Sequence, residues 1–116
     1  MKDLAPDVFR QRMILEGITS EVIAPENIKR LLDCLCWSLN MVALTAPTLS
    51  YCENYGWCGH MHWVTSGVHM YTWENRKPPF FSIDIYTCKS FNHYDAEECV
   101  REFLGDNLKK LTWKEV

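Results

Sequence analysis

The chain has 116 residues, of which 47% are hydrophobic and 23% are charged, and its formal net charge is −3. This length suits one domain with its own core and excludes large two-lobed enzymes, so residues 1–116 are expected to form a single domain. A mildly acidic chain lacks the basic surface that attracts nucleic acids or anionic membranes, and we expect neither as a partner.

No targeting segment or membrane span is evident in the sequence. Residues 1–12 have no apolar core of signal-peptide length, and no segment approaches the roughly 18 apolar residues that cross a bilayer. We therefore expect a cytoplasmic protein. Its six cysteines would then be reduced thiols, mostly small buried residues, rather than three disulfides.

The first predicted elements are a short strand and an amphipathic helix. Residues 12–18 form an apolar run interrupted by a glycine, which is typical of a strand. A helix is expected to begin at Pro25 and to end near Asn40, because Ile28 and four leucines up to Leu39 recur at three- and four-residue spacing.

The middle of the chain is predicted to be rich in strands. The expected strands are residues 41–49, 59–65, 68–74 and 80–88. Pro47 would make the first of these an edge strand or end it, and residues 50–58 resemble a loop. A tight turn at Ser66-Gly67 is expected to join the second and third strands, and residues 75–79 contain a turn with two prolines.

A second helix and a final edge strand complete the prediction. Asn92 and Asp95 have the spacing of an N-cap and its third helical residue, and Gly105 suits the position after the helix. Residues 110–116 are expected to add a strand. The order β-α-β-β-β-β-α-β indicates an α+β two-layer sandwich, with a mostly antiparallel sheet and both helices on one face.

Cys58, His60 and His62 alternate along one predicted strand and therefore share a face. Two imidazoles and a thiolate are suitable zinc ligands, and Cys88 is a possible fourth. The spacing lacks the usual zinc motifs, however, and a half-polar strand explains it equally simply. We favour the second interpretation and predict no metal.

Ser66 and Gly67 are a second candidate for chemistry. A sharp turn between two strands can strain the peptide bond before a serine and expose its hydroxyl. A plain hairpin turn that uses serine for its turn propensity is the simpler explanation from spacing alone.

The segment YGWCGHMHWVTSGVHMYTWE, followed by FFSIDIYTCKSFNHYDAEECVREFL, resembles the short prokaryotic S-adenosylmethionine decarboxylases. The similarity extends from about Gln11 to Asn107. The matching positions are Tyr55, Gly56, Gly59, Ser66, Thr72, Trp73, Asp84, Tyr86, Thr87 and Cys88. The resemblance implies a self-cleaving, pyruvoyl-dependent homodimer of polyamine and spermidine biosynthesis, in which two chains pair through their sheets.

The resemblance also implies a role for individual residues. The chain would cleave between Thr65 and Ser66, and Ser66 would become a pyruvoyl group whose carbonyl binds the substrate amine and accepts electrons as carbon dioxide leaves. Cys88 would protonate the product. Cys58 stands where the family has a serine thought to assist processing.

Four further positions depart from the family pattern. Thr65-Ser66-Gly67 replaces Glu-Ser-His, and Tyr71 replaces the histidine that serves as the base for ester elimination. A phenol, with an ordinary pKa near 10, is a poor base at neutral pH, and His69 is a possible substitute. The ribose-binding glutamate of the family would fall at Asn75, with Glu74 one position earlier.

Two further functions remain open at this stage. The chain can be a non-catalytic paralogue that keeps the fold and acts as a nucleoside-binding or regulatory module. It can also be a decarboxylase of a basic amino acid rather than of S-adenosylmethionine.

Overall fold

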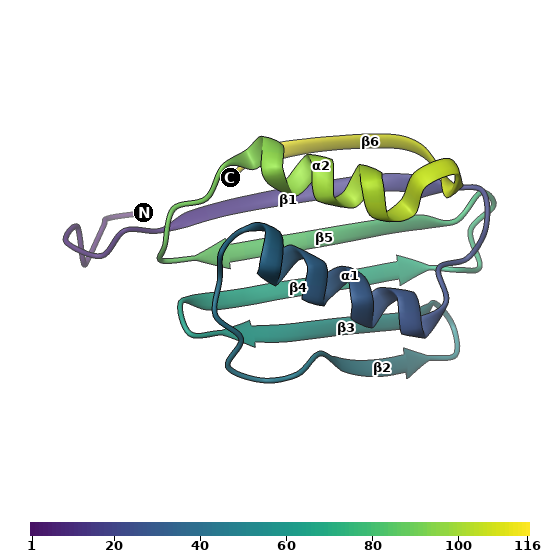
Figure 1. Cartoon of the computed structure of the whole chain (residues 1–116), viewed down its shortest axis with the longest axis horizontal. Helices are drawn as coiled ribbons and strands as arrows, with labels where there is room; N and C mark the ends of the chain where they lie inside the picture. The colour runs from purple at the N-terminus through teal and green to yellow at the C-terminus, as the bar shows by residue number, and fades with distance from the viewer.

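The computed structural model describes residues 1–116 and arranges them in two layers (Figure 1). A six-stranded sheet forms one layer, and two helices lie across one of its faces. This arrangement confirms the predicted α+β two-layer sandwich and the predicted order of strands and helices. No helix is long and apolar enough to cross a membrane.

The elements in chain order are β1 (Gln11–Thr19), α1 (Pro25–Ser38), β2 (Thr48–Cys52), β3 (Gly56–Trp63), β4 (Ser66–Trp73), β5 (Phe80–Thr87), α2 (His93–Leu104), a 3₁₀ turn η1 (Gly105–Asn107) and β6 (Leu108–Glu115). The strands lie in the order β2-β3-β4-β5-β1-β6, and every neighbouring pair is antiparallel. Strand β1 therefore enters the sheet between β5 and β6, far from its sequence neighbours.

The core lies between the sheet and the two helices. Side chains alternate along each central strand, and those that face the helices are fully buried, such as Met13 and Leu15 on β1 and Ile83 and Ile85 on β5. The helices contribute an apolar stripe at the spacing expected from the sequence: Ile28, Leu31, Leu32, Leu35, Ala96 and Val100. The opposite face of the sheet has no helix over it (Figure 1).

The predicted boundaries of the strands and the loop in residues 41–58 were wrong. Residues 41–47 form a loop with a single bridge between Ala43 and Trp63, and β2 begins only after Pro47, which has no backbone N–H for a ladder. The expected loop at 50–58 instead contains the end of β2 and the start of β3.

The turn between β3 and β4 also differs from the prediction. Val64 and Thr65 form it, whereas Ser66 is already the first residue of β4 and pairs with Trp63. Gly67 therefore lies in a strand. A Cβ atom there would come within 2.6 Å of the Met61 carbonyl oxygen, so the glycine permits a close approach of two strands instead of making a turn.

Gly59 shows how closely helix α1 packs on the sheet. A Cβ atom at this position would lie 2.9 Å from a Leu49 methyl carbon and 3.1 Å from side-chain carbons of Ile28 and Leu32. At this position β3 therefore has no space for a side chain beneath α1. The glycine of the family motif at this position has a packing role.

We expect Gly59→Ala to destabilise the protein by about 1–3 kcal/mol, because the added methyl group overpacks a filled core. Urea denaturation followed by circular dichroism would measure this loss. The control is Ser82→Ala on the opposite face, where a change of less than about 0.5 kcal/mol is expected. Equal stabilities for the two variants would contradict the proposed packing of α1.

Candidate active site

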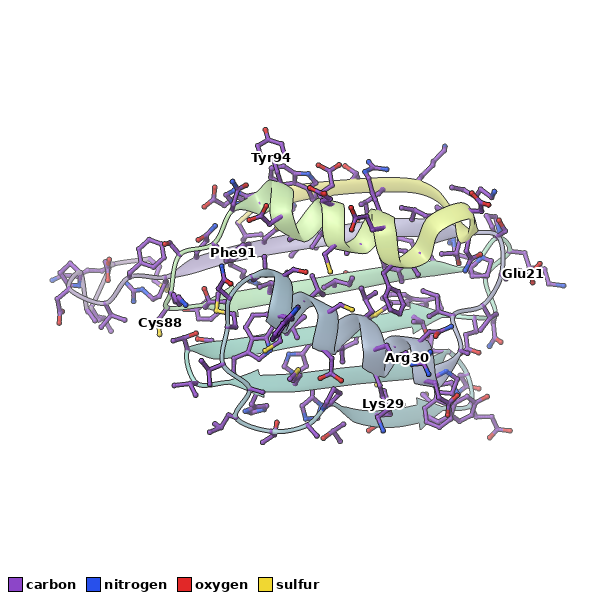
Figure 2. All side chains as sticks on the ribbon, viewed as in Figure 1. Glu21, Lys29, Arg30, Cys88, Phe91 and Tyr94 are labelled. Atoms are coloured by element: carbon purple, nitrogen blue, oxygen red, sulfur yellow. The ribbon has the colours of Figure 1, made fainter.

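The turn between β3 and β4 lies beside the end of β5, where these inner strands of the sheet end. Ser66 pairs with Thr87, and the backbone N–H of Cys88 donates a hydrogen bond of 2.9 Å to the Thr65 carbonyl oxygen. Figure 2 shows Cys88 at this end of β5. The carbonyl of the Thr65–Ser66 peptide is therefore held and polarised by a fixed donor.

The backbone at Ser66 has an unusual conformation. Its φ angle is +135°, in a region that L-amino acids rarely adopt, and such a conformation costs roughly 1–3 kcal/mol. Residues held in this way concentrate at functional sites. The sequence analysis favoured a plain hairpin turn over a strained backbone, but the strain is present, at the first residue of a strand rather than within a turn.

Neighbouring side chains anchor the turn and the segment after β5. The Thr65 hydroxyl donates a hydrogen bond to the Met41 sulfur at 3.3 Å, and the Lys89 ammonium donates one to the Asn40 carbonyl oxygen at 2.6 Å. Both contacts reach the loop that follows α1. The Thr65 side chain is therefore engaged with this loop, while its carbonyl oxygen accepts the hydrogen bond from Cys88.

A cavity of about 340 Å³ opens beside Ser66. It is lined by residues of β1, β3, β4 and β5, namely Arg12, Met61, His62, Ser66, Gly67, His69, Asp84 and Tyr86. Most of these belong to the face of the sheet that no helix covers. The cavity brings two predicted site residues, Ser66 and His69, together with a histidine and an ion pair that the sequence analysis did not assign.

Three histidine rings lie close together on this face, His60 stacked on His69 and edge-on to His62. His60 lies opposite His69 in the ladder with ring centroids 5.3 Å apart, and His62 lies 5.6 Å from His60. His69 in turn lies opposite Asp84, which receives two hydrogen bonds of 3.0 and 2.7 Å from Arg12. The His69 ring therefore lies beside the Asp84 carboxylate, whose negative charge is already paired with Arg12.

The histidine group is not arranged as a metal site. No set of three or more His, Cys, Asp or Glu side chains converges in a way that could hold a metal ion. Cys58 lies opposite Tyr71 in the ladder, and Cys88 follows the end of a different strand. The four candidate ligands therefore do not share one site.

The pKa of His69 is lowered from the ordinary histidine value of 6.5. Burial is the main cause, followed by repulsion from a protonated His60, and a smaller repulsion comes from His62. Asp84 acts in the opposite direction and raises this pKa. His69 is therefore neutral at pH 7 and able to accept a proton.

Cys58 and Tyr71 lie far from Ser66 of the same chain. They face each other in the ladder five positions along β3 and β4 from the Trp63–Ser66 pair, or about 16 Å at 3.3 Å per residue. Tyr71 is 43% exposed on the uncovered face. The structure therefore separates these two predicted site residues from the cleavage site.

Glu74 and Asn75 lie still farther away, just beyond the end of β4 opposite Ser66. A Glu74 carboxylate oxygen accepts a hydrogen bond of 2.7 Å from the Trp57 backbone, and the Asn75 amide donates one of 2.6 Å to the Asn54 carbonyl. Both side chains thus fix the turn before β3. Their assignment to substrate binding remains a prediction.

The family model for S-adenosylmethionine decarboxylase matches residues 14–114, which include nearly the whole sheet and both helices. The chain belongs to the S-adenosylmethionine decarboxylase family. A search of curated proteins finds no match. Family membership agrees with the sequence resemblance and gives the cavity beside Ser66 a chemical context.

The sequence analysis did not assign Arg12, Asp84 or His62 to the cavity beside Ser66. Only the pairing of β1 with β5 brings Arg12 to Asp84, and these strands are separated by three other strands and a helix in the chain. The sequence did contain a signal for His62, because its spacing from His60 predicts that both side chains lie on one face of a strand. Its nearness to Ser66 depends on the exact position of the turn.

We expect the imidazole of His69 to titrate below pH 6.5, and the protein to lose stability as the pH falls through this range. A histidine whose folded pKa lies below its unfolded value binds its proton more readily after unfolding, so acid favours the unfolded chain. NMR titration of the histidine ring protons would measure the first effect. Urea denaturation at several pH values would measure the second, and His69→Gln should reduce the acid-dependent loss. A ring that titrates above pH 6.5 would contradict this assignment.

Proposed function

We propose that this protein is a pyruvoyl-dependent decarboxylase of S-adenosylmethionine that cleaves its own chain between Thr65 and Ser66. The observation that carries the proposal is the hydrogen bond from the Cys88 N–H to the Thr65 carbonyl oxygen, next to a strained Ser66. Family membership supports the reaction class. Spermidine biosynthesis would then be the process that the protein serves.

The hydrogen bond suits the first step of cleavage. When the Ser66 hydroxyl oxygen attacks the Thr65 carbonyl carbon, negative charge develops on the carbonyl oxygen, and the Cys88 N–H is already placed to stabilise it. The C–N bond then breaks while the hydroxyl proton passes to the Ser66 nitrogen, so that the acyl group moves from nitrogen to oxygen and the nitrogen becomes a free amine. This step also releases the backbone strain at Ser66.

The residues around Ser66 fit a pyruvoyl group at this position. When present, that group would supply a carbonyl that binds the substrate amine and accepts electrons during loss of carbon dioxide. The adjoining cavity of about 340 Å³ is within the size range of small-molecule sites. Its ion pair of Arg12 and Asp84 and the Tyr86 ring offer charged and aromatic contacts to a nucleoside with an amino acid tail. The exposed Cys88 thiol lies at the edge of the site and would deliver a proton to the product.

We further propose that the protein acts as a homodimer whose chains pair through the uncovered sheet face. Cys58 and Tyr71 lie on this face about 16 Å from Ser66 of their own chain. Only a second chain packed on the same face can bring them to a Ser66. All six cysteines are unpaired, which agrees with the reducing cytoplasm as the proposed location.

A second candidate function is a non-catalytic binding or regulatory module with the same fold. It is favoured by Gly67 and Tyr71, which replace two histidines of the family pattern, and by the structural contacts of Glu74 and Asn75. Calorimetry with S-adenosylmethionine on an uncleaved chain would test it. Binding without cleavage would favour this module over the enzyme.

We expect the purified chain to separate into two fragments, residues 1–65 and 66–116, because the Thr65 carbonyl is activated and the Ser66 backbone is strained. Intact mass spectrometry would detect them, and Ser66→Ala should abolish cleavage. The cleaved protein should release labelled carbon dioxide from carboxyl-labelled S-adenosylmethionine, with arginine as the comparison for a basic amino acid. A chain that remains at 13.6 kDa after long incubation would contradict the proposal.

The dimer can be tested with pairs of variants. If Cys58 and Tyr71 act on the partner chain, a Ser66→Ala chain and a doubly substituted Cys58→Ala, Tyr71→Phe chain should each be less active alone than mixed together. The mixed dimer retains one complete site, so about a quarter to a half of the native activity should return. Absence of any recovery in a mixture shown to exchange subunits would contradict a shared site.

A further inference from the structure

Two side chains on the uncovered face lie one ladder pair from Ser66: Tyr86 on β5, which carries a phenol and is a poor base at neutral pH, and His62 on β3, which carries an imidazole. His62 lies directly opposite Gly67 in the ladder between β3 and β4, one pair away from Ser66. Gly67 has no side chain to separate the two, and the 2.6 Å approach of a Cβ atom to the Met61 carbonyl oxygen shows why none fits there. His62 is exposed, and both His62 and Ser66 line the same cavity.

The other candidate bases are less well placed. Tyr71 is about 16 Å away in the same chain and carries a phenol. His69 lines the cavity but lies three residues beyond Ser66 on β4, or about 10 Å along the strand. It also stacks between His60 and Tyr71, with centroid distances of 5.3 and 6.1 Å, which restricts its ring.

We propose that His62 is the catalytic base that removes the Cα proton of Ser66 during self-cleavage, within its own chain. This inference rests on the proposed function and adds a residue that the sequence resemblance did not include. It explains how processing proceeds although the family's histidine is replaced by Tyr71. The imidazole has moved from β4 to β3, to the position that faces the glycine after the reactive serine.

The step balances as a β-elimination of the ester formed by acyl shift. His62 takes the Cα proton, the electron pair forms the Cα–Cβ double bond, and the Cβ–Oγ bond breaks. The leaving group is the carboxylate of Thr65, which ends the fragment 1–65. Residue 66 is left as an enamine, and water then replaces its nitrogen, which departs as ammonia, to give the pyruvoyl group.

Several charged or titratable groups surround His62 and will shape its pH response. His60 lies on the same strand, and the other groups line the same cavity: His69 on β4, Asp84 and Tyr86 on β5, and Arg12 on β1. Arg12 and Asp84 neutralise each other through their paired hydrogen bonds.

The test is cleavage of the full-length His62→Asn chain, followed by intact mass spectrometry with and without hydroxylamine, which cuts esters. If His62 acts in elimination, the rate should fall by about 10²- to 10⁴-fold, and an ester that hydroxylamine splits between residues 65 and 66 should accumulate. Added imidazole should partly restore cleavage of His62→Ala. The dependence of the native rate on pH between 5 and 8, where imidazoles ionise, should flatten in His62→Asn.

The matched control is His60→Asn, which removes a neighbouring imidazole two positions farther from Ser66 on the same strand. Its cleavage rate should stay within about threefold of the native rate. Native-like cleavage of His62→Asn would overturn the assignment of the base while leaving the proposed function intact. So would a folded His62→Asn chain that stays whole and resists hydroxylamine, because the defect would then precede the elimination. A native chain that neither cleaves nor forms an ester would contradict the proposed function itself, and the role of His62 with it.

Discussion

The chemistry proposed for this protein depends on one hydrogen bond, from the Cys88 N–H to the Thr65 carbonyl oxygen. It exists because β3, β4 and β5 are consecutive antiparallel strands, so that the turn between the first two lies beside the end of the third. Without it, the peptide before Ser66 would be an ordinary amide in an exposed turn. The six-stranded sheet acts as a frame that holds this carbonyl against its donor.

Regular patterns in the sequence predicted most of the fold. Alternation identified β5, and leucine spacing identified α1, because both arise from local geometry and one-sided burial. The position of the β3–β4 turn was not predicted, because Gly67 resembles a turn residue although it serves a close contact between strands. The ion pair of Arg12 and Asp84 depends on a pairing of β1 with β5 that no local pattern encodes.

The family motif combines residues with two kinds of role. Gly59 leaves room for α1, and Gly56, at a φ of +134°, leaves room for the Glu74 side chain that caps the start of β3. These positions explain why the family fold is recognisable, but they carry no chemistry. The proposed activity would depend on far fewer positions around Ser66, where this chain departs from the family pattern. A family match over residues 14–114 and an altered site are therefore compatible.

The location of the base determines which steps need a second chain. With His62 as the base in the same chain as Ser66, the proposed acyl shift and elimination would use only groups from β3, β4 and the segment that ends β5, and self-cleavage would be unimolecular. Cys58 and Tyr71 lie about 16 Å away on the uncovered face and would contribute only if two sheets pack together. Because Tyr71 replaces the family's histidine on β4, self-cleavage would then no longer depend on dimer formation. The prosthetic group would form in a lone chain, whereas the complete substrate site would form only in the dimer.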